Sequence, residues 1–299
     1  MLDERQISLR GLVMGPGTPY KILEFEAWTR TVRASDTDRA WAHGAYSGAE
    51  WHKDAVIPIL VEIQASSATE WRYHHRRLAA AARPVETGSS PELRYRLRGD
   101  TEEFMQRVRP RGVMPKIRQL GGGMIRTGLS VVALDPTVYS GEEYSTGDVG
   151  LPLIEGGLVA PWTAPLLSVV TISAGRATLL NRGDRAVGLR IRLTAGADGL
   201  VQPVITMARP DGIVQSLRIA LDLTDGDYLD IDTSAQTIVL NGTASRRSYV
   251  TGDWPILPGT DPLAESLGEA ILTSDLSWSA SAPSETATMS ALWRDAYST

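Results

Sequence analysis

The second half of this chain is a series of short segments in which apolar and polar residues alternate, separated by turn residues. In Val214–Leu223, for example, Leu217, Ile219 and Leu221 alternate with Arg218. A period of two is typical of a strand with one buried face, and turns about every ten residues are typical of antiparallel sandwiches. We therefore predict an all-β antiparallel sandwich of jelly-roll type over residues 166–299. Its predicted strands are Val169–Ser173, Ala177–Asn181, Val187–Leu193, Val201–Met207, Val214–Leu223, Tyr228–Asp232, Thr237–Leu240, Leu276–Ala280 and Thr286–Leu292.

One hairpin of this sandwich carries a specific turn signal. Asp230–Asp232 and Thr237–Leu240 are predicted strands joined by a polar turn, and Asn241-Gly242 follows the second strand. Asn and Gly tolerate the positive φ angles of a type I′ turn, so we expect the chain to reverse direction at this pair.

The segment Asp253–Thr260 is a predicted loop. Its two prolines, Pro255 and Pro258, limit the conformations that the loop adopts before folding. It also carries two large apolar side chains, those of Trp254 and Leu257. We predict that these side chains anchor the loop against the sandwich.

The first half of the chain mixes strand and helix patterns. Ser67-Ala68-Thr69-Glu70 is a candidate capping box, in which the Ser and Glu side chains bond to free amide groups at a helix start, and Pro84 should end that helix. Asp100–Glu103 predicts a second helix with Phe104 and Val108 on one side. We therefore predict an α+β domain over residues 1–134, with helices against a largely antiparallel sheet. Its predicted strands are Gln6–Val13, Ile22–Trp28, Ile57–Gln64, Leu93–Leu97, Val113–Gln119 and Leu129–Ala133.

Residues 135–165 are rich in turn residues and poor in regular patterns, which predicts a linker between two domains. The charge also changes near this point. Residues 1–140 contain 20 Lys and Arg against 16 Asp and Glu, a balance of +4, whereas residues 141–299 contain 10 against 19, a balance of −9. The positive excess is too small for a nucleic-acid-binding surface, so we interpret the change as a mark of the domain boundary.

The composition narrows the function further. Zero cysteines exclude disulfides, thiol catalysis and cysteine-ligated metal sites. The sequence lacks an apolar run of about 18 residues, and its N-terminus does not match a secretory signal peptide. We expect a protein that is made in a reducing cytoplasm and does not insert into a membrane.

Histidine is the commonest metal ligand, so a metal site is the first chemistry to consider. His74 and His75 are adjacent on the predicted helix, so their side chains diverge by about 100° and cannot hold one ion together. His43 and His52 lie in the predicted polar loop Ser35–Lys53, near the carboxylates of Asp36, Asp38, Glu50 and Asp54. A solvated loop accounts for these residues, and we expect no metal ion and no cofactor.

A glycosidase is the second chemistry to consider. Asp230 and Asp232 should share one face of a strand, and a pair of carboxyl groups about 5 to 9 Å apart hydrolyses glycosidic bonds. Asp225-Gly226-Asp227, however, is first of all a turn, in which Asp side chains bond to nearby amides. The Gly121-Gly122-Gly123 cluster fits a hairpin tip better than a phosphate site, because no helix start follows it. Nucleophile, phosphate and zinc motifs are missing from the sequence, so we expect no catalytic residues.

The eight tryptophans leave one alternative open. Sandwich lectins stack sugars on exposed tryptophans, whereas most large aromatic side chains belong to a core or an interface.

Several segments, in this order and spacing, resemble the distal tail proteins of long-tailed, non-contractile bacteriophages. The last of them is similar to the end of minor tail proteins from phages with actinobacterial hosts. The segments that carry the resemblance are Asp38–Trp51, Val56–Gln64, Ala177–Leu193, Thr237–Gly242, Trp254–Gly259 and Met289–Tyr297.

The resemblance implies an architectural protein of the virion, assembled in the host bacterial cytoplasm and without enzymatic activity. It implies a homohexameric ring at the tail tip, closed by the N-terminal domains, that joins the tail tube protein to the tail-associated hub protein. The C-terminal sandwich would be galectin-like and would carry receptor-binding or other minor tail proteins. The alternative function is a carbohydrate-binding tail module that contacts the host surface directly.

Overall fold

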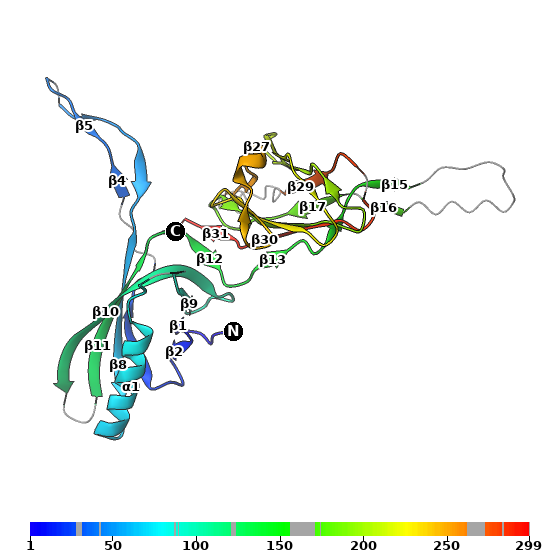
Figure 1. Cartoon of the computed structure of the whole chain (residues 1–299). Helices are drawn as coiled ribbons and strands as arrows, with labels where there is room; N and C mark the ends of the chain where they lie inside the picture. The colour runs from blue at the N-terminus through cyan, green and yellow to red at the C-terminus, as the bar shows by residue number, and fades with distance from the viewer. Residues whose placement is uncertain are drawn as a thin grey trace, which may run out of the picture. The chain divides into compact units, whose positions relative to one another are not determined.

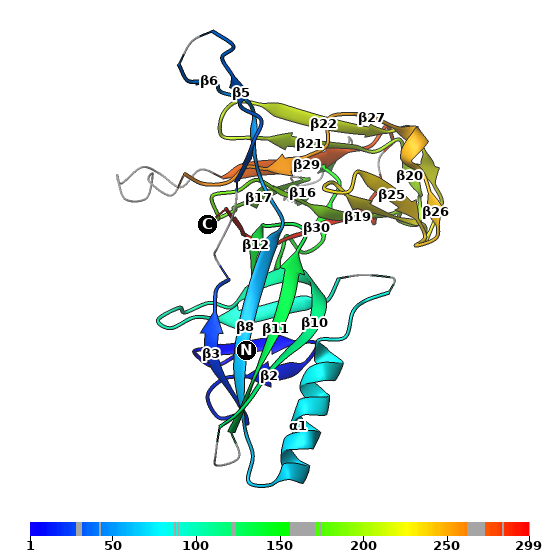
Figure 2. The same ribbon diagram turned by 90° about the vertical axis from the view of Figure 1, so that its left-hand side faces the viewer.

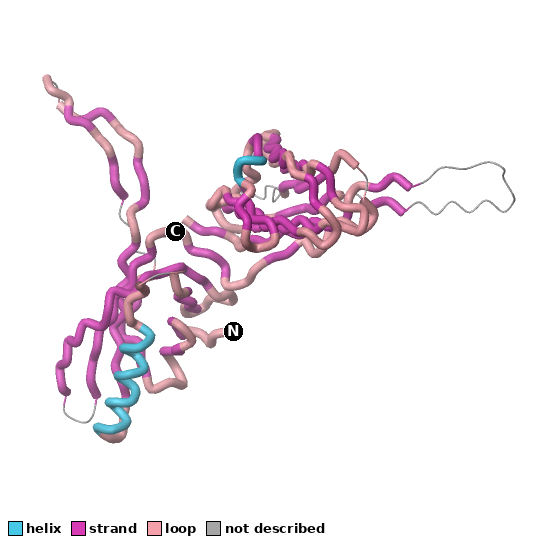
Figure 3. Tube along the Cα trace, in the orientation of Figure 1, coloured by secondary structure: helices cyan, strands magenta, loops and turns pink. Residues whose placement is uncertain are grey.

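The computed structural model describes residues 1–27, 32–41, 43–86, 88, 90–120, 124–155, 171–173, 175–261, 273–282 and 284–298. These residues form two compact units, Met1–Glu142 and Glu143–Tyr297. Both units are built mainly from antiparallel strands (Figures 1 and 3). Within the described ranges there is one α-helix, and it belongs to the first unit.

The first unit is organised around an antiparallel sheet. Alternate residues of its long strand β8 (Ala55–Gln64) are buried, as the alternation in the sequence predicts: Ile57, Ile59, Val61 and Ile63. The strand order is β2 (Leu12–Met14), β1 (Gln6–Leu9), β9 (Glu92–Arg96), β10 (Phe104–Leu120), β11 (Met124–Ala133), β8 (Ala55–Gln64) and β3 (Tyr20–Phe25), with β12 (Val138–Ser140) paired to β10.

The helix α1 (Ala68–Ala81) contacts β8, β10 and β2, beside the sheet in Figure 2. Its first turn confirms the capping prediction, because the Glu70 amide donates to the Ser67 hydroxyl at 3.1 Å. The Glu70 carboxylate accepts a hydrogen bond from the Ser66 amide at 2.8 Å and so holds the residue before the cap. The helix buries Leu78 and ends at Ala82, ahead of Pro84.

The second predicted helix is wrong. Residues from Phe104 onward form β10, which pairs with β9, β11 and β12. Met105 and Val108 are both buried in this sheet. Pro110 would interrupt a helix at its second turn, whereas the strand bulges between Pro110 and Val113. Sheet pairing with distant residues therefore overrides the local capping signal.

The predicted strand Gln6–Val13 is in fact a hairpin of β1 and β2. The turn lies at Arg10 and Gly11, whose φ angles of 50° and 77° match a type I′ turn. Arginine is uncommon in this left-handed region, so the sequence carries only the glycine as a signal.

The second unit contains two antiparallel sheets and several short pairs of strands. The first sheet has the order β13 (Tyr144–Ser145), β30 (Thr288–Trp293), β19 (Arg190–Thr194), β24 (Tyr228–Asp232), β25 (Thr237–Leu240) and β26 (Ala244–Ser245), with β14 (Val149–Gly150) also on β30. The second has the order β17 (Arg176–Leu179), β29 (Ser274–Ser279), β21 (Val204–Ala208), β22 (Val214–Ile219) and β27 (Val250–Gly252). The short pairs are β15 (Leu153–Glu155) with β16 (Thr171–Ser173), β18 (Val187–Gly188) with β28 (Ile256–Leu257), and β20 (Leu200–Val201) with β23 (Asp222–Leu223). The remaining elements of this unit are η1 (Arg247–Tyr249) and β31 (Ala296–Tyr297).

Two tryptophans join the sheets into a sandwich. The indole of Trp278, in β29, donates to the Gly150 carbonyl at 3.1 Å, which belongs to the other sheet. The indole of Trp293, in β30, donates in the opposite direction to the Leu180 carbonyl, beside β17, at 2.9 Å. Both indoles are buried, so the apolar faces of the two sheets share one core.

The local predictions for the second unit match the structure closely. Each of the nine predicted segments contains a strand, although residues 169 and 170 lie outside the described residues. Asn241 and Gly242 have φ angles of 50° and 69°, and the Thr243 amide donates to the Leu240 carbonyl, which confirms the type I′ turn.

The segment predicted as a linker, 135–165, contains strands as far as it is described. β12 belongs to the first unit, and β13, β14 and β15 belong to the second. Residues 156–165 of that prediction lie outside the described residues.

Candidate interaction surfaces

A long ribbon, called here the arm (residues 32–54), extends from the sheet of the first unit between β3 and β8 (Figures 1 and 3). The sequence predicts this stretch as a polar loop, and the structure instead forms two pairs of short strands. These are β4 (Val32–Ala34) with β7 (Glu50–His52), and β5 (Thr37–Asp38) with β6 (Ala45–Tyr46).

The arm has no core of its own. Every described residue in it is exposed except Gly48, which is half-buried. Trp41 is 99% exposed and Trp51 49%. Two guanidinium groups lie over aromatic rings, Arg33 at 5.4 Å from the centre of Trp51 and Arg39 at 4.9 Å from the centre of Tyr46.

Backbone contacts set the path of the arm. The Gly48 amide donates to the Asp36 carboxylate at 2.8 Å, and the Ser35 amide donates to the Ala49 carbonyl at 3.1 Å. A Cβ atom at Gly48 would lie 2.2 Å from the Ser35 carbonyl oxygen, so only glycine fits this approach. Two-stranded ribbons without a packed face are marginally stable in water, which makes the arm a candidate interaction surface.

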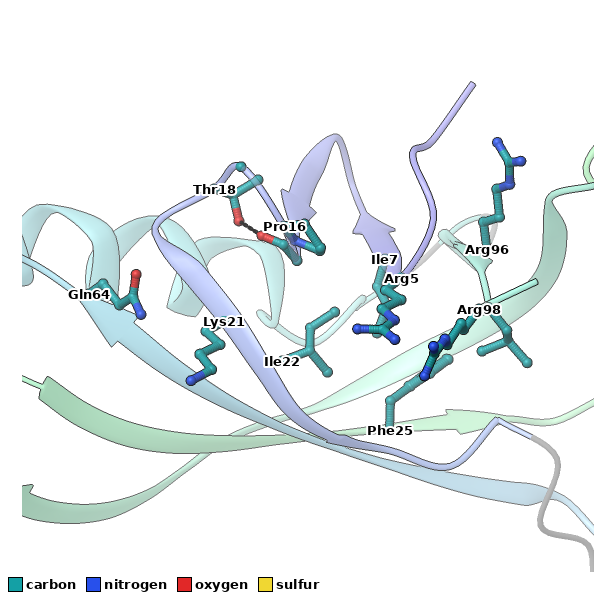
Figure 4. Close-up of a pocket in the computed structure, with 13 residues that line it drawn as sticks. Arg5, Ile7, Pro16, Thr18, Lys21, Ile22, Phe25, Gln64, Arg96 and Arg98 are labelled. Carbon is teal, nitrogen blue, oxygen red and sulfur yellow. Dashed lines mark hydrogen bonds between the residues drawn. The ribbon is translucent and has the colours of Figure 1, made fainter. Parts of the chain in front are cut away.

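A second feature of the first unit is a cavity of about 530 Å³ between β1, the β2–β3 turn, β3 and the end of β9. Figure 4 shows its lining. Ile7, Ile22 and Phe25 supply apolar lining, and Arg5, Lys21 and Arg98 supply positive charge. The sequence analysis did not find this cavity, because its residues come from three distant segments; the only signal was the positive balance of residues 1–140.

The four histidines considered as metal ligands lie in separate places. His43 and His52 are exposed residues of the arm. His74 is buried and contacts the Tyr20 hydroxyl through Nδ1 at 3.3 Å, whereas His75 stacks on Trp71 at 4.9 Å. Within the part of the chain that the structure describes, His, Asp and Glu do not form a group of three that could hold a metal ion.

The aspartates considered for glycoside hydrolysis have structural partners. Arg192 donates two hydrogen bonds to the Asp230 carboxylate, at 2.7 and 3.1 Å. The Asp232 carboxylate accepts from the Ala235 amide at 2.9 Å in the turn after β24. Hydrogen bonds from Thr224 and Asn241 lower the pKa of Asp227 and tie one turn to the Asn-Gly turn.

Asp230, Asp232, Arg190, Arg192 and Ser290 also line a hollow of about 390 Å³ on the first sheet of the sandwich. This surface combines acidic, basic and hydroxyl groups, as sugar sites do. The described tryptophans of this unit are not near its surface, because Trp254, Trp278 and Trp293 are 9%, 2% and 9% exposed.

The loop Asp253–Thr260 packs as predicted. Leu257 is 1% exposed, and its short strand β28 pairs with β18. The Arg247 guanidinium covers the Trp254 ring at 4.8 Å from its centre. The helix α1, at 14 residues, is too short and too polar to cross a bilayer, and it is the only α-helix in the described ranges.

Solved structures with the same fold come from phage tails. The Dit protein of phage SPP1, described as a paradigm of the hub adsorption apparatus in phages that infect Gram-positive bacteria, superposes with a TM-score of 0.62 and 11% identity, over 98% of this chain and 99% of that chain. A chain of the phage P2 baseplate in its activated conformation with Ca gives 0.53 and 10% identity, over 96% of this chain and 97% of that chain. The corresponding structure with Sr gives 0.50 and 10%, over 97% and 98%.

No protein-family model matches the sequence, and no curated protein matches it significantly. The similarity therefore lies in the fold, and it spans nearly the whole chain. At that level it confirms the resemblance to phage distal tail proteins that the sequence motifs indicated.

Proposed function

We propose that this protein is an architectural subunit of a phage tail tip, a distal tail protein that assembles into a homohexameric ring. The observation that carries the proposal is the fold shared with SPP1 Dit over 98% of the chain. In this assignment the first unit is the α+β ring domain, and the second is a jelly-roll, galectin-like sandwich.

The arm supports self-association. Its strands bury nothing within the chain, and Trp41 and Trp51 present aromatic surface. A subunit that lays such an arm on its neighbour forms a head-to-tail contact, which closes into a ring when the rotation between copies is right. The other partners in this proposal are the tail tube protein on one side and the tail-associated hub protein on the other. The sandwich carries receptor-binding or other minor tail proteins.

The proposal assigns no catalytic role. The candidate carboxylates already bond to arginine, amide and hydroxyl groups of their own turns and strands. A water-activating or nucleophilic pair needs at least one carboxylate that is available to the substrate.

Ring formation is tested on the purified full chain by light scattering and electron microscopy. We expect particles of about six times the 32.4 kDa chain mass. Replacing residues 33–53 by a short Gly-Ser linker should give monomers with an unchanged melting temperature. The matched control exchanges Ile213 and Val214, exposed apolar residues of the second unit, for serine and should leave the ring intact. A full chain that stays monomeric at all concentrations refutes the proposal.

The two units should also differ when separated. We propose that residues 1–142 self-associate and that residues 143–299 fold as a monomer. A monomeric first fragment beside a self-associating second fragment contradicts this division of roles.

Direct glycan binding is the second candidate, and the hollow beside Arg192 and Asp230 favours it. An array of host cell-wall polysaccharides probed with the full chain separates it from pure scaffolding. Retention on the array that is lost in Arg190→Ala, while ring formation persists, would establish a binding module.

A further inference from the structure

The described lining of the cavity in the first unit carries positive charge without a matching negative charge. Arg5 and Arg98 line the cavity together with the Phe25 ring, and Lys21 lines it from another position on β3 (Figure 4). The residues that line the cavity include no Asp or Glu. Within the described ranges, Arg5, Lys21 and Arg98 form no ion pair.

Arg96 differs from these three cations. Its side chain points away from the cavity in Figure 4 and donates to the Asp100 carbonyl at 2.9 Å and the Leu2 carbonyl at 3.3 Å. Arg96 therefore holds the chain around the cavity, whereas the other three are available to a ligand.

The cavity is formed without a ligand, because its rim is fixed by hydrogen bonds. The Gln6 side chain donates to the Pro16 carbonyl at 3.0 Å, and the Thr18 hydroxyl donates to the Gly15 carbonyl at 2.8 Å. Gly15 has a φ of 124°, and a Cβ atom there would lie 2.5 Å from the Arg5 carbonyl oxygen. A rim that is already ordered loses little entropy on binding.

We propose that this cavity is the docking site for an acidic peptide segment of another protein, in which carboxylates flank one aromatic or aliphatic side chain. The apolar side chain covers the floor of Ile22 and Phe25, and the carboxylates meet Arg5, Lys21 and Arg98. A free inorganic anion would satisfy the cations and leave the apolar floor in water.

The arm of a second copy fits this cavity poorly. Its aromatic residues Trp51 and Tyr46 lie beneath the guanidinium groups of Arg33 and Arg39, so a cation would accompany each ring into a cationic cavity. The arm also carries the carboxylates of Asp36, Asp38, Glu50 and Asp54, so a second copy is an occupant that the experiment must separate. The proposal commits to a separate acidic partner, and occupation by a second copy would appear as a change of oligomeric state.

The test uses the full chain and a fluorescein-labelled peptide, Asp-Glu-Phe-Asp-Glu, followed by fluorescence anisotropy. We expect saturable binding that weakens with added salt. The variant Arg5→Gln/Lys21→Gln/Arg98→Gln should lose about tenfold or more in affinity, because it removes the facing charges. The control Arg72→Gln/Arg76→Gln/Arg83→Gln removes three exposed arginines of the same unit and should bind like the parent chain.

Further probes separate the other occupants. A peptide with Ser in place of Phe should bind more weakly, and neither pyrophosphate nor a thymidine oligonucleotide should displace the parent peptide at equal concentration. Equal loss in both triple variants, equal binding of the Ser peptide, or displacement by either anion would overturn the proposal.

Two controls test whether the triple variant is folded and whether its oligomeric state is unchanged. Melting curves check that the triple variant folds, and the charge-conserving Arg5→Lys/Arg98→Lys variant should retain binding. Light scattering on the triple variant should match the parent chain. A changed oligomeric state would mean that a second copy occupies the cavity, and the proposal would be wrong. Because peptide binding is measured equally on monomers, its failure is distinct from failure of the ring.

Discussion

Two segments that carry tryptophan and lack a regular pattern in the sequence differ in how deeply they are buried. The loop Asp253–Thr260 of the second unit buries Trp254 to 9% exposure and Leu257 to 1%. The arm of the first unit leaves Trp41 at 99% and Trp51 at 49%. Both segments form short strands. In the loop, β28 pairs with β18, which lies outside the loop, whereas the strands of the arm pair only with one another.

The difference in burial separates a segment that the unit stabilises by packing from one that gains no packing within the chain. The loop has two prolines and an alternation of apolar residues, so it loses little entropy when it packs. In the arm, Arg33 lies over Trp51 and Arg39 over Tyr46, as Arg247 does over Trp254, but no apolar core lies behind the described rings of the arm. Such rings contribute to stability only when another surface removes them from water.

The largest effect should come from Trp254→Ala. Loss of a buried indole costs about 3–5 kcal/mol of unfolding free energy, so the transition of the second unit should shift strongly downward in calorimetry. The first unit should melt unchanged. An unaltered thermogram would mean that the indole contributes no packing energy, and the contrast with the arm would disappear.

A smaller effect should come from the glycines of the turns. Gly242→Ala places an alanine at a φ of 69°, in the left-handed region that alanine rarely adopts. This strain should lower the unfolding free energy of the sandwich by about 1–2 kcal/mol. Gly44→Ala imposes the same strain at φ 93° in the arm. Urea unfolding should register the first substitution and miss the second, because the arm opens without unfolding the unit. Equal destabilisation by both would show that the arm is part of the cooperative core.

Trp41→Ala/Trp51→Ala should change the unfolding free energy by less than about 0.5 kcal/mol, since both rings are exposed. It should instead weaken assembly, seen as a higher protein concentration at the midpoint of ring formation in light scattering. A melting shift as large as that of Trp254→Ala, with assembly intact, would reverse the roles of the two segments.

The smallest effect is the pH dependence carried by Asp227. Its folded pKa lies below the ordinary value of 3.8, so the stability it contributes is present above that pH. The contribution is lost as the pH falls through the folded pKa. Asp227→Asn should flatten the acid limb of the melting temperature of the second unit against pH. Parallel acid limbs for both proteins would exclude this turn as a source of acid sensitivity.

Local signals predicted the sandwich well because its strands follow one another through short turns. Asn241-Gly242 and the alternation around Ile219 specify their own geometry within ten residues. The capping box at Ser67 succeeded for the same reason. The prediction for the stretch after Asp100 failed because pairing with β9, β11 and β12 decides its conformation, and the last two strands lie well beyond it in the sequence.

The surfaces proposed for binding were harder to predict. Arg5, Lys21 and Arg98 line one cavity only after separate segments of the first unit fold together. The spacing of these residues in the sequence does not predict that they lie together. The arm was predicted as a solvated loop, since its pattern lacks an apolar face. Its exposure was predicted correctly; its ribbon structure depends on backbone approaches such as Gly48 to Ser35.

The close approach at Gly48 also bears on solubility before assembly. An exposed ribbon offers unpaired amide and carbonyl groups on both outer edges, and such edges template aggregation. Arg33, Asp36, Asp38 and Lys53 place both signs of charge along those edges. Charged residues of this kind act as gatekeepers against edge-to-edge pairing of the wrong chains. Such charges let a chain keep an exposed ribbon in solution without edge-to-edge aggregation.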